Sequence, residues 1–415
     1  MSEQTAERRH RLRRMQGRDP GESHRAATPL ELLFDLTFVI AFGVAGNELA
    51  HFLAEEHFAA GIGGFLFAVF GIAWAWINFA WFASAYDTDD WVFRLLTMLQ
   101  MVGVLIFALG LPALFDSLEH GAHVDNGVLV LGYVVMRVPM VVQWARAARQ
   151  DPARRSDCQA YIVTILIAQA GWVGLLVADP SIAAFFGVAA VLILIEITGP
   201  AIAEIRYGGT PWHPHHIAER YGLLVIITLG EALIGTMATL TALVGPDGPG
   251  WSADVALVGL AGTALTFGMW WIYFIIPSGE VLSARRERSF GWGYGHIPMF
   301  GAVVAVGAGL HVAALDIEGE SELGTVGTLA TVAIPAAVFV AGVYWMYSVL
   351  TRSRDPFHLL LLAGSAAVLV ASVLLAAAGA PVAWCLLVLA LTPWVTVAGY
   401  ELRGHRHDEA VLAEL

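Results

Sequence analysis

Long apolar runs, separated by short polar segments, recur along the whole chain. A run of roughly 20 apolar residues crosses about 30 Å of hydrocarbon as a helix, and a helix satisfies its own backbone hydrogen bonds there. We therefore predict an all-α polytopic membrane protein with about twelve transmembrane helices. The predicted spans are 30–52, 61–84, 94–115, 127–147, 159–178, 182–203, 219–243, 254–276, 292–315, 325–349, 357–378 and 381–400.

Two of the predicted turns are short, at Asp179-Pro180 and at Gly379-Ala380-Pro381. Each turn joins two spans that could instead form one long or re-entrant element, so ten or eleven spans remain alternatives.

The composition supports a single membrane domain. Of the 415 residues, 58% are hydrophobic and 14% are charged, whereas a soluble chain usually carries about 25% charged residues. The two cysteines belong to no CxxC or Cys/His motif. Residues 1–27 are polar and rich in arginine, without the apolar core of a signal peptide. We expect 1–27 and 403–415 to be cytoplasmic tails, the first of them disordered.

The distribution of charge predicts the orientation. The chain has no lysine, and its basic loop and tail residues all fall on one side if the N-terminus is cytoplasmic. The loops on the other side are acidic or neutral. Cytoplasmic loops of membrane proteins carry the excess of basic residues, so we predict that both termini are cytoplasmic. The same pattern explains the arginines without nucleic-acid binding, and it suits contact with anionic membrane lipids.

The two halves of the chain resemble each other. Glu31 opens the first span and Glu219 opens the seventh, 188 residues later. The segments 76–79 (WINF) and 271–274 (WIYF) are 195 residues apart, and 101–103 (MVG) and 299–301 (MFG) are 198 apart. We interpret residues 28–205 and 206–402 as two six-helix repeats. An even number of spans gives both copies the same orientation, the parallel arrangement known among transporters.

Three segments carry a family resemblance: 27–39 (ATPLELLFDLTFV), 219–231 (ERYGLLVIITLGE) and 294–299 (YGHIPM). They resemble the bacterial low temperature requirement protein A family, over most of the chain from about Ala27 onward. The resemblance implies a bacterial membrane protein, which we expect in the cytoplasmic (inner) membrane. The family is named for a growth phenotype in the cold, so the resemblance implies no particular substrate or reaction.

Charged residues within the spans are the best candidates for a site, because a charge at a span's centre costs at least about 2.5–3.5 kcal/mol. Arg137, Glu196 and Glu231 lie near the middle of the fourth, sixth and seventh spans. We expect the three to meet at the midplane, where one carboxylate would pair with Arg137 and the other could carry a proton. The alternative is a purely structural ion pair that fixes helix register.

A second candidate site lies at the start of the first span. Glu31 and Asp35 are four residues apart and share one helix face. Arg220 follows Glu219 at the start of the seventh span, and we expect Arg220 to pair with both carboxylates. The segment 28–31 (TPLE) also has the form of a helix-capping box, which is an alternative role for Glu31.

The remaining candidates are weaker. Glu48 and His51 are three residues apart near the other end of the first span, where solvation at the interface is the simpler interpretation. His296 is an isolated histidine for which hydrogen bonding in the core is expected. The histidines at 213, 215 and 216 lack the further ligands of a recognisable metal site. We also expect Trp76 at a membrane interface.

We therefore predict a secondary transporter that carries an unidentified small solute, with the proton as the candidate coupling ion. Two alternatives stay open: a membrane enzyme acting on lipid-linked substrates, and a non-catalytic membrane sensor or assembly protein. The sequence contains no nucleotide-binding, zinc-protease or hydrolase motif. It therefore indicates no catalytic residue, cofactor or metal, and it does not reveal the oligomeric state.

Overall fold

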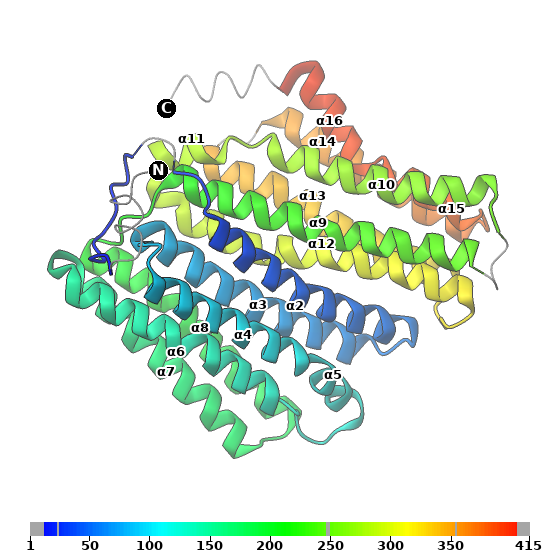
Figure 1. Cartoon of the computed structure of the whole chain (residues 1–415). Coiled ribbons are helices and arrows are strands. Elements are labelled where there is room, and N and C mark those ends of the chain that lie inside the picture. Colours follow the sequence, from blue (N-terminus) through cyan, green and yellow to red (C-terminus); the bar gives the residue numbers. More distant parts are fainter. Residues whose placement is uncertain (1–11, 23–24, 246–249, 353–354, 405–415) are drawn as a thin grey trace, which may run out of the picture. The chain divides into compact units, whose positions relative to one another are not determined.

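A computed structural model describes residues 12–22, 25–245, 250–352 and 355–404, and these residues are almost entirely helical (Figure 1). Twelve helical segments in this part of the chain, some made of two consecutive helices, are long and apolar enough to cross a membrane. The prediction of an all-α protein with twelve spans is thus confirmed. The helices are α2 (Pro29–Ala54), α3 (Phe58–Tyr86), α4 (Trp91–Leu109), α5 (Leu111–His120), α6 (Gly127–Gln150), α7 (Arg155–Ala178), α8 (Ile182–Tyr207), α9 (Pro214–Val244), α10 (Ala253–Phe274), α11 (Ser278–Ala284), α12 (Ser289–Glu318), α13 (Gly324–Thr351), α14 (Pro356–Ala377), α15 (Val382–Ala390) and α16 (Thr392–Gly399).

Local sequence explains where several helices begin and end. Asp90 caps the start of α4 by accepting a hydrogen bond from the Phe93 amide, and Asp355 caps α14 in the same way, directly before Pro356. The two short turns are true helix ends. Asp179 and Gly379 both adopt left-handed backbone conformations there, with φ of 42° and 83°, which terminates the preceding helix.

The described chain divides into two compact units that differ from the predicted halves. Unit 1 consists of 1–41 and 74–220, and unit 2 consists of 42–73 and 221–415. The chain passes from one unit to the other within α2, α3 and α9. The last change of unit falls in the first turns of α9, and a helical hairpin from the first predicted half belongs to unit 2. The predicted boundary between repeats near residue 205 is not tested by these units. The predicted repeat itself stays a prediction.

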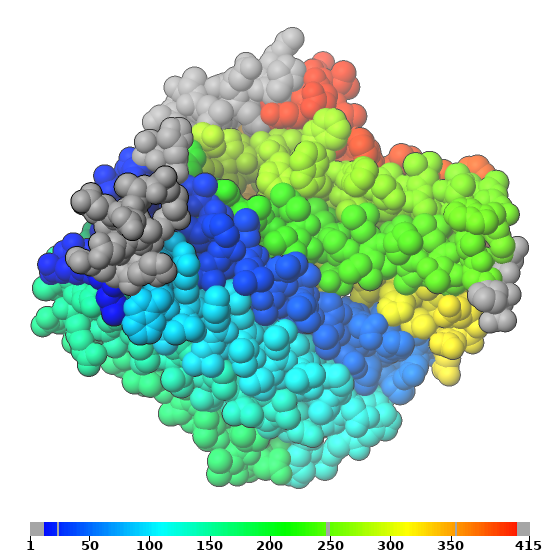
Figure 2. Space-filling model, in the orientation of Figure 1, coloured from blue at the N-terminus to red at the C-terminus, as the bar shows by residue number. Residues whose placement is uncertain are grey.

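In unit 1, α6 packs between α4 and α7, and α8 packs against α7. The contact between α4 and α6 is close, because a Cβ atom at Gly132 would lie 2.3 Å from the Phe107 amide nitrogen. The opposite face of α4 is apolar and exposed, as expected for contact with lipid acyl chains, and this face is visible in Figure 2. Its exposed side chains recur every three or four residues: Leu95, Met98, Leu99, Val102, Leu105 and Leu109.

In unit 2, α12 is the most buried span. It packs along α13, while α10 and α14 contact the two short helices α15 and α16. A Cβ atom at Gly235 of α9 would lie 2.3 Å from the Gly307 carbonyl oxygen of α12, so these two helices approach at backbone distance. The Thr239 hydroxyl adds a hydrogen bond of 2.7 Å to the Leu310 carbonyl.

The N-terminal segment makes defined contacts with unit 1. Met15 is fully buried, its amide donates to the Gln150 side chain (2.6 Å), and the Gly17 amide donates to Asp151 (3.0 Å). The expectation of a disordered tail is therefore wrong for 12–22 and 25–27, since side chains at the end of α6 bind this backbone. The rest of that tail, 1–11 and 23–24, and the second predicted tail from 405 onward lie outside the described residues.

Candidate functional site

Three fully buried charged side chains meet at one end of unit 1. Glu31 and Asp35 project from the first turns of α2, and Arg220 projects from the start of α9. An Arg220 guanidinium nitrogen lies 2.8 Å from Glu31 Oε1, and a second one bonds Asp35 Oδ1. The predicted pairing of Arg220 with both carboxylates is thus confirmed. It follows from the four-residue spacing of the carboxylates, which turns both toward α9.

Glu31 has two structural roles. Its Oε2 atom accepts hydrogen bonds from the Thr28 amide (2.8 Å) and hydroxyl, while the Glu31 amide donates to the Thr28 hydroxyl (3.3 Å). This is the capping box that the sequence indicates. Its Oε1 atom faces Arg220 and lies 3.2 Å from His216 Nε2. The cap fixes the Glu31 side chain and leaves its second oxygen free to take part in the charged group.

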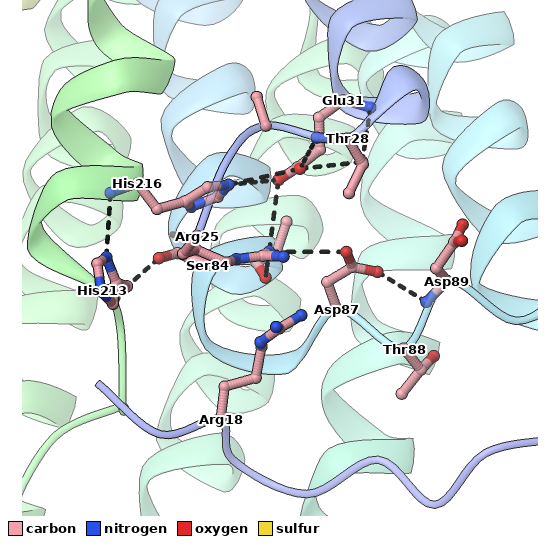
Figure 3. Close-up of polar contacts among 12 residues, drawn as sticks. Arg18, Arg25, Thr28, Glu31, Ser84, Asp87, Thr88, Asp89, His213 and His216 are labelled. Carbon is pink, nitrogen blue, oxygen red and sulfur yellow. Dashed lines mark hydrogen bonds and ion pairs between the residues drawn. The ribbon is translucent and has the colours of Figure 1, made fainter. Parts of the chain in front are cut away.

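Two further charged residues extend the site (Figure 3). Arg25 of the N-terminal segment lies 3.6 Å from an Asp87 carboxylate oxygen and 4.0 Å from Glu31 Oε1, and it donates to the Ala83 carbonyl. Asp87 follows α3, outside the spans. Burial and the nearby Glu31 carboxylate raise the pKa of Asp87 to about 6, against the opposing effect of Arg25. Sequence reasoning missed both residues, because they lie in a presumed tail and in a loop.

Trp76 is part of the site rather than of the membrane interface. Its side chain is fully buried, and its indole nitrogen donates a 2.6 Å hydrogen bond to Asp35 Oδ1. The Arg220 guanidinium lies 5.6 Å from the Trp76 ring centroid, within range of a cation–π interaction. The predicted interfacial position is therefore wrong: proximity to the end of α3 does not expose the ring, because α2 and α9 cover it.

We call these groups the carboxylate–arginine cluster; its members are Arg25, Glu31, Asp35, Asp87, His216 and Arg220. Three carboxylates face two guanidinium groups, so the cluster is balanced when it binds one proton. Asp35 Oδ2, His216 Nδ1 and Arg220 Nε are buried without a hydrogen-bond partner among the described residues. Buried polar atoms are nearly always paired. Asp35 Oδ2 and His216 Nδ1 are therefore positions where a proton would bind, whereas the Arg220 Nε–H group can only donate.

The groups around the cluster are already paired. Arg18 and Glu22 form a salt bridge (2.7 Å), and Glu22 also lies 3.9 Å from Arg25 of the cluster. Burial acts to raise the pKa of Glu22, but Arg18 and Arg25 outweigh it and hold this pKa below its usual value. Glu219 is exposed and accepts a hydrogen bond from the Ala27 amide. His213 Nδ1 accepts from the His216 amide, so its Nε2 donates to the Glu22 carbonyl. Among the described residues no group of three or more His, Cys, Asp or Glu side chains could hold a metal ion.

A second charged group, Arg146 and Asp90, attaches the N-terminal segment to unit 1. Arg146 of α6 bonds both carboxylate oxygens of Asp90, and the Arg13 amide donates to Asp90 at 3.1 Å. Arg146 also donates to the Arg13 carbonyl at 2.6 Å. These donors outweigh burial and lower the pKa of Asp90 to about 2. The N-terminal segment is thus attached to unit 1 by an ion pair that stays charged at neutral pH.

Arg137 and Glu196 form a complete buried pair in unit 1. Their nearest side-chain atoms lie 3.1 Å apart. Tyr133 donates to the same Glu196 oxygen, and the Trp172 indole donates to the other at 2.9 Å. The adjoining cavity has a volume of only about 10 Å³, far below the roughly 300–1,000 Å³ of typical ligand sites. Every carboxylate oxygen has a donor, which fits the structural alternative.

Glu231 belongs to unit 2, so its meeting with Arg137 and Glu196 stays a prediction. Its carboxylate is half-buried and lies against α2, where a Cβ atom at Gly43 would come within 2.9 Å of Glu231 Oε1. Helix α9 continues through Gly230 and Glu231 without interruption. Within unit 2, the Glu231 carboxylate therefore faces Gly43 of α2, and α9 has no break beside it.

The weaker candidates also lie in unit 2. Glu48 is half-buried and His51 is exposed. The His51 ring is 5.5 Å from the His311 ring, a pairing that the sequence did not indicate. His296 is fully buried; its Nδ1 donates to the Trp292 carbonyl and its Nε2 accepts from the Tyr273 hydroxyl. That arrangement is a neutral, fully bonded core histidine, as expected.

These features define a multi-pass α-helical membrane protein with a buried charged cluster. The family model for the bacterial low temperature requirement A protein (LtrA) matches residues 26–392, and the chain belongs to this family. An uncharacterized protein of Rhizobium meliloti (strain 1021) is 27% identical over 349 residues, which cover 79% of this chain and 78% of the relative. No solved structure matches the chain.

Proposed function

We propose that this protein is a proton-coupled secondary transporter in which the carboxylate–arginine cluster binds the coupling proton. The observation that carries the proposal is the charge balance of the cluster. Three carboxylates and two guanidinium groups are almost completely withdrawn from solvent, where an unbalanced charge is costly. One bound proton restores neutrality. Because the pKa of Asp87 is about 6, the cluster can gain or lose that proton near neutral pH.

The predicted internal repeat supports a transporter architecture. Each unit contains a small cavity, of about 10 Å³ in unit 1 and about 40 Å³ in unit 2. The first is lined from α3, α6, α7 and α8. The second is lined from α10 and the residues after it, from α13, α14 and α16, and from the short π-helix Tyr400–Gly404. Corresponding lining residues are separated by 198 positions from Trp74 to Ile272, 206 from Arg137 to Val343, 197 from Tyr161 to His358 and 200 from Glu196 to Thr396.

These separations of 197 to 206 positions lie close to the 188, 195 and 198 of the sequence landmarks. A duplicated six-helix unit would produce such a pattern, since the same four helices of each copy would surround the same cavity. Parallel repeats of this kind occur in transporters. The distribution of arginine supports an orientation with both termini in the cytoplasm. The cluster would then lie at the cytoplasmic end of unit 1, in a bacterial inner membrane.

Proton binding can be measured before the solute is identified. We would reconstitute the protein into liposomes on a solid-supported membrane and record the charge displaced by a step from pH 8 to pH 5. Wild type should give a transient current, and Asp35→Asn and Asp87→Asn should reduce it severalfold. The matched control is Asp179→Asn, which changes an exposed carboxylate in the turn after α7. It should behave as wild type.

Coupling is then tested with a panel of amino acids, organic cations and carboxylates, with a pH-sensitive dye enclosed in the liposomes. A panel member that drives proton movement in wild type and not in Asp35→Asn would support transport. If all variants gave the wild-type current in the pH step, the cluster would not be the proton site. A pH-step current in wild type without solute-driven proton movement from any panel member would favour a proton-sensing or structural role instead.

A further inference from the structure

Unit 2 contains a large apolar groove that the proposed transport mechanism does not use. Its volume is about 510 Å³, within the range of about 300–1,000 Å³ typical of ligand sites. The groove is formed by α2, α3, α12 and α13. Leu66 and Ile334 on its lining are 62% and 65% exposed, so the groove opens sideways from these candidate spans.

The lining offers almost no hydrogen-bonding group. Eighteen of its residues are aliphatic, aromatic, glycine or proline, and Thr331 is the exception. The Thr331 hydroxyl already donates to the Thr328 carbonyl at 2.7 Å. A solute with polar groups would lose its hydration there without replacement. Apolar cavities instead accept apolar ligands, so the lining selects a hydrocarbon.

The extent of the groove matches one leaflet of a bilayer. On α3 the lining runs from Phe58 to Val69, eleven residue steps or about 17 Å of helix. Along α13 it runs from Leu323, directly before the helix, to Val338, fifteen residue steps or about 22 Å. Half of the hydrocarbon thickness is about 15 Å. A groove that begins at helix ends and stops near mid-span fits a single acyl chain from one leaflet.

The rim of the groove is acidic. Phe58 and Leu323 lie beside two turns that are joined by a 2.8 Å hydrogen bond from the Glu322 amide to the Ala54 carbonyl. These turns carry exposed carboxylates at 55, 56, 320 and 322. The described residues of these two turns include no arginine. An anionic headgroup would be repelled here, whereas an ammonium group would be attracted.

We propose that this groove is a lipid-binding site for one acyl chain of a zwitterionic aminophospholipid, with the ammonium group against the acidic rim. The hydrocarbon fills the space between α3, α12 and α13. The rim selects the headgroup. The site is independent of the carboxylate–arginine cluster, which belongs to unit 1.

The test uses the full-length protein in liposomes of mixed phosphatidylethanolamine and phosphatidylglycerol. Trace phosphatidylethanolamine with a photoactivatable diazirine in its acyl chain is crosslinked, and the labelled peptides are identified by mass spectrometry. We expect labels concentrated in 58–69, 297–305 and 323–338. Ala305→Phe fills the groove and should lower labelling there at least fivefold. Ala190→Phe, on an exposed face of α8, is the matched control and should leave it unchanged.

Two further measurements keep the test decisive. If Ala305→Phe does not fold, Ile334→Trp at the exposed opening replaces it and should also lower groove labelling. The triple variant Glu55→Gln, Glu56→Gln, Glu322→Gln should abolish the preference for the phosphatidylethanolamine probe over a phosphatidylglycerol probe. Equal labelling of the α7 and α8 surfaces and of the groove, or unchanged groove labelling in a folded groove-filling variant, would overturn the proposal. Equal labelling by both headgroup probes in wild type would overturn the headgroup assignment.

Discussion

The substitution Asp87→Asn should make the protein more stable, and more so at alkaline than at acidic pH. Asp87 is buried beside Glu31, and its pKa is raised from 3.8 to about 6. A carboxyl group with a raised pKa binds its proton more tightly in the folded protein than in the unfolded chain. Stability therefore falls as the pH rises from about 3.8 to about 6 and the folded protein has to accept the charge. Asparagine resembles the protonated carboxyl group and removes this cost.

The magnitude follows from the two pKa values. Each pH unit of displacement corresponds to about 1.4 kcal/mol, so ionised Asp87 costs roughly 3 kcal/mol at pH 8. At pH 5 the folded carboxyl group is mostly protonated and the unfolded one mostly ionised, and the cost falls to about half that value. The asparagine keeps a side-chain oxygen for the Asp89 amide, which donates to Asp87 at 2.7 Å. The loop conformation should therefore survive the change.

The measurement is the thermal unfolding midpoint of the detergent-solubilised protein at pH 5, 6, 7 and 8. Asp87→Asn should raise the midpoint at every pH, with the largest increase at pH 8. Asp179→Asn is the control. It changes an exposed carboxylate in the turn after α7, away from the loop that holds Asp87. This substitution should not reproduce the large increase at pH 8.

A result opposite in sign would refute the reasoning about charge balance. If Asp87→Asn lowered the midpoint at pH 8, the carboxylate would be stabilised by Arg25 more than it is penalised by burial and by Glu31. An increase that did not change with pH would mean that Asp87 does not titrate in this range. In either case the cluster would not reach neutrality by binding a proton at Asp87 in this pH range.

Three further substitutions test other parts of unit 1. Glu196→Gln leaves Arg137 buried without its carboxylate and should lower the free energy of unfolding by about 3–5 kcal/mol. The thermal unfolding midpoint should fall accordingly, and replacing both residues by methionine should partly restore it. Thr28→Ala removes the helix cap shared with Glu31 and should lower the free energy of unfolding by about 1 kcal/mol. Thr28→Ser keeps the hydroxyl and should retain most of the wild-type stability in the same assay. Asp90→Asn should destabilise the protein at pH 7. The lowered pKa of Asp90 contributes stability above pH 3.8, and this contribution is lost as the pH falls toward 2. The unfolding midpoints of the variant and the wild type should therefore converge in acid.

Sequence reasoning found the helices because the requirement for an apolar span is a property of composition and length. It did not find the breaks within spans, such as the one at Gly110 between α4 and α5, because a break of one residue leaves the apolar run intact. It also did not predict the compact units. These units divide α2, α3 and α9, because compactness depends on which helices pack together, not on the order of the repeats.

The pairing of Arg220 with Glu31 and Asp35 was predictable, since a shared helix face and a nearby cation are visible in the sequence. Arg25 and Asp87 were not, because nothing in a polar tail or a loop signals that it is folded back over a helix end. The sequence does carry one signal that the prediction did not use. Two carboxylates beside one arginine in an apolar setting leave one negative charge uncompensated, which is a reason to look for further charged partners.

Two of the buried charged groups of unit 1 show why burial alone does not identify a functional site. Arg137 and Glu196 cancel one for one, and each oxygen of Glu196 has a donor, so this pair can remain unchanged through any cycle. The carboxylate–arginine cluster has an excess carboxylate and an Asp35 oxygen without a partner, so its neutral form requires a ligand as small as a proton. Substitutions should separate these roles. Glu196→Gln should impair folding, whereas Asp87→Asn should preserve the fold and reduce the current in a pH step. If Glu196→Gln instead folded normally and lost the current, the functional charge would be the midspan pair, and the imbalance of the cluster would be compensated structurally.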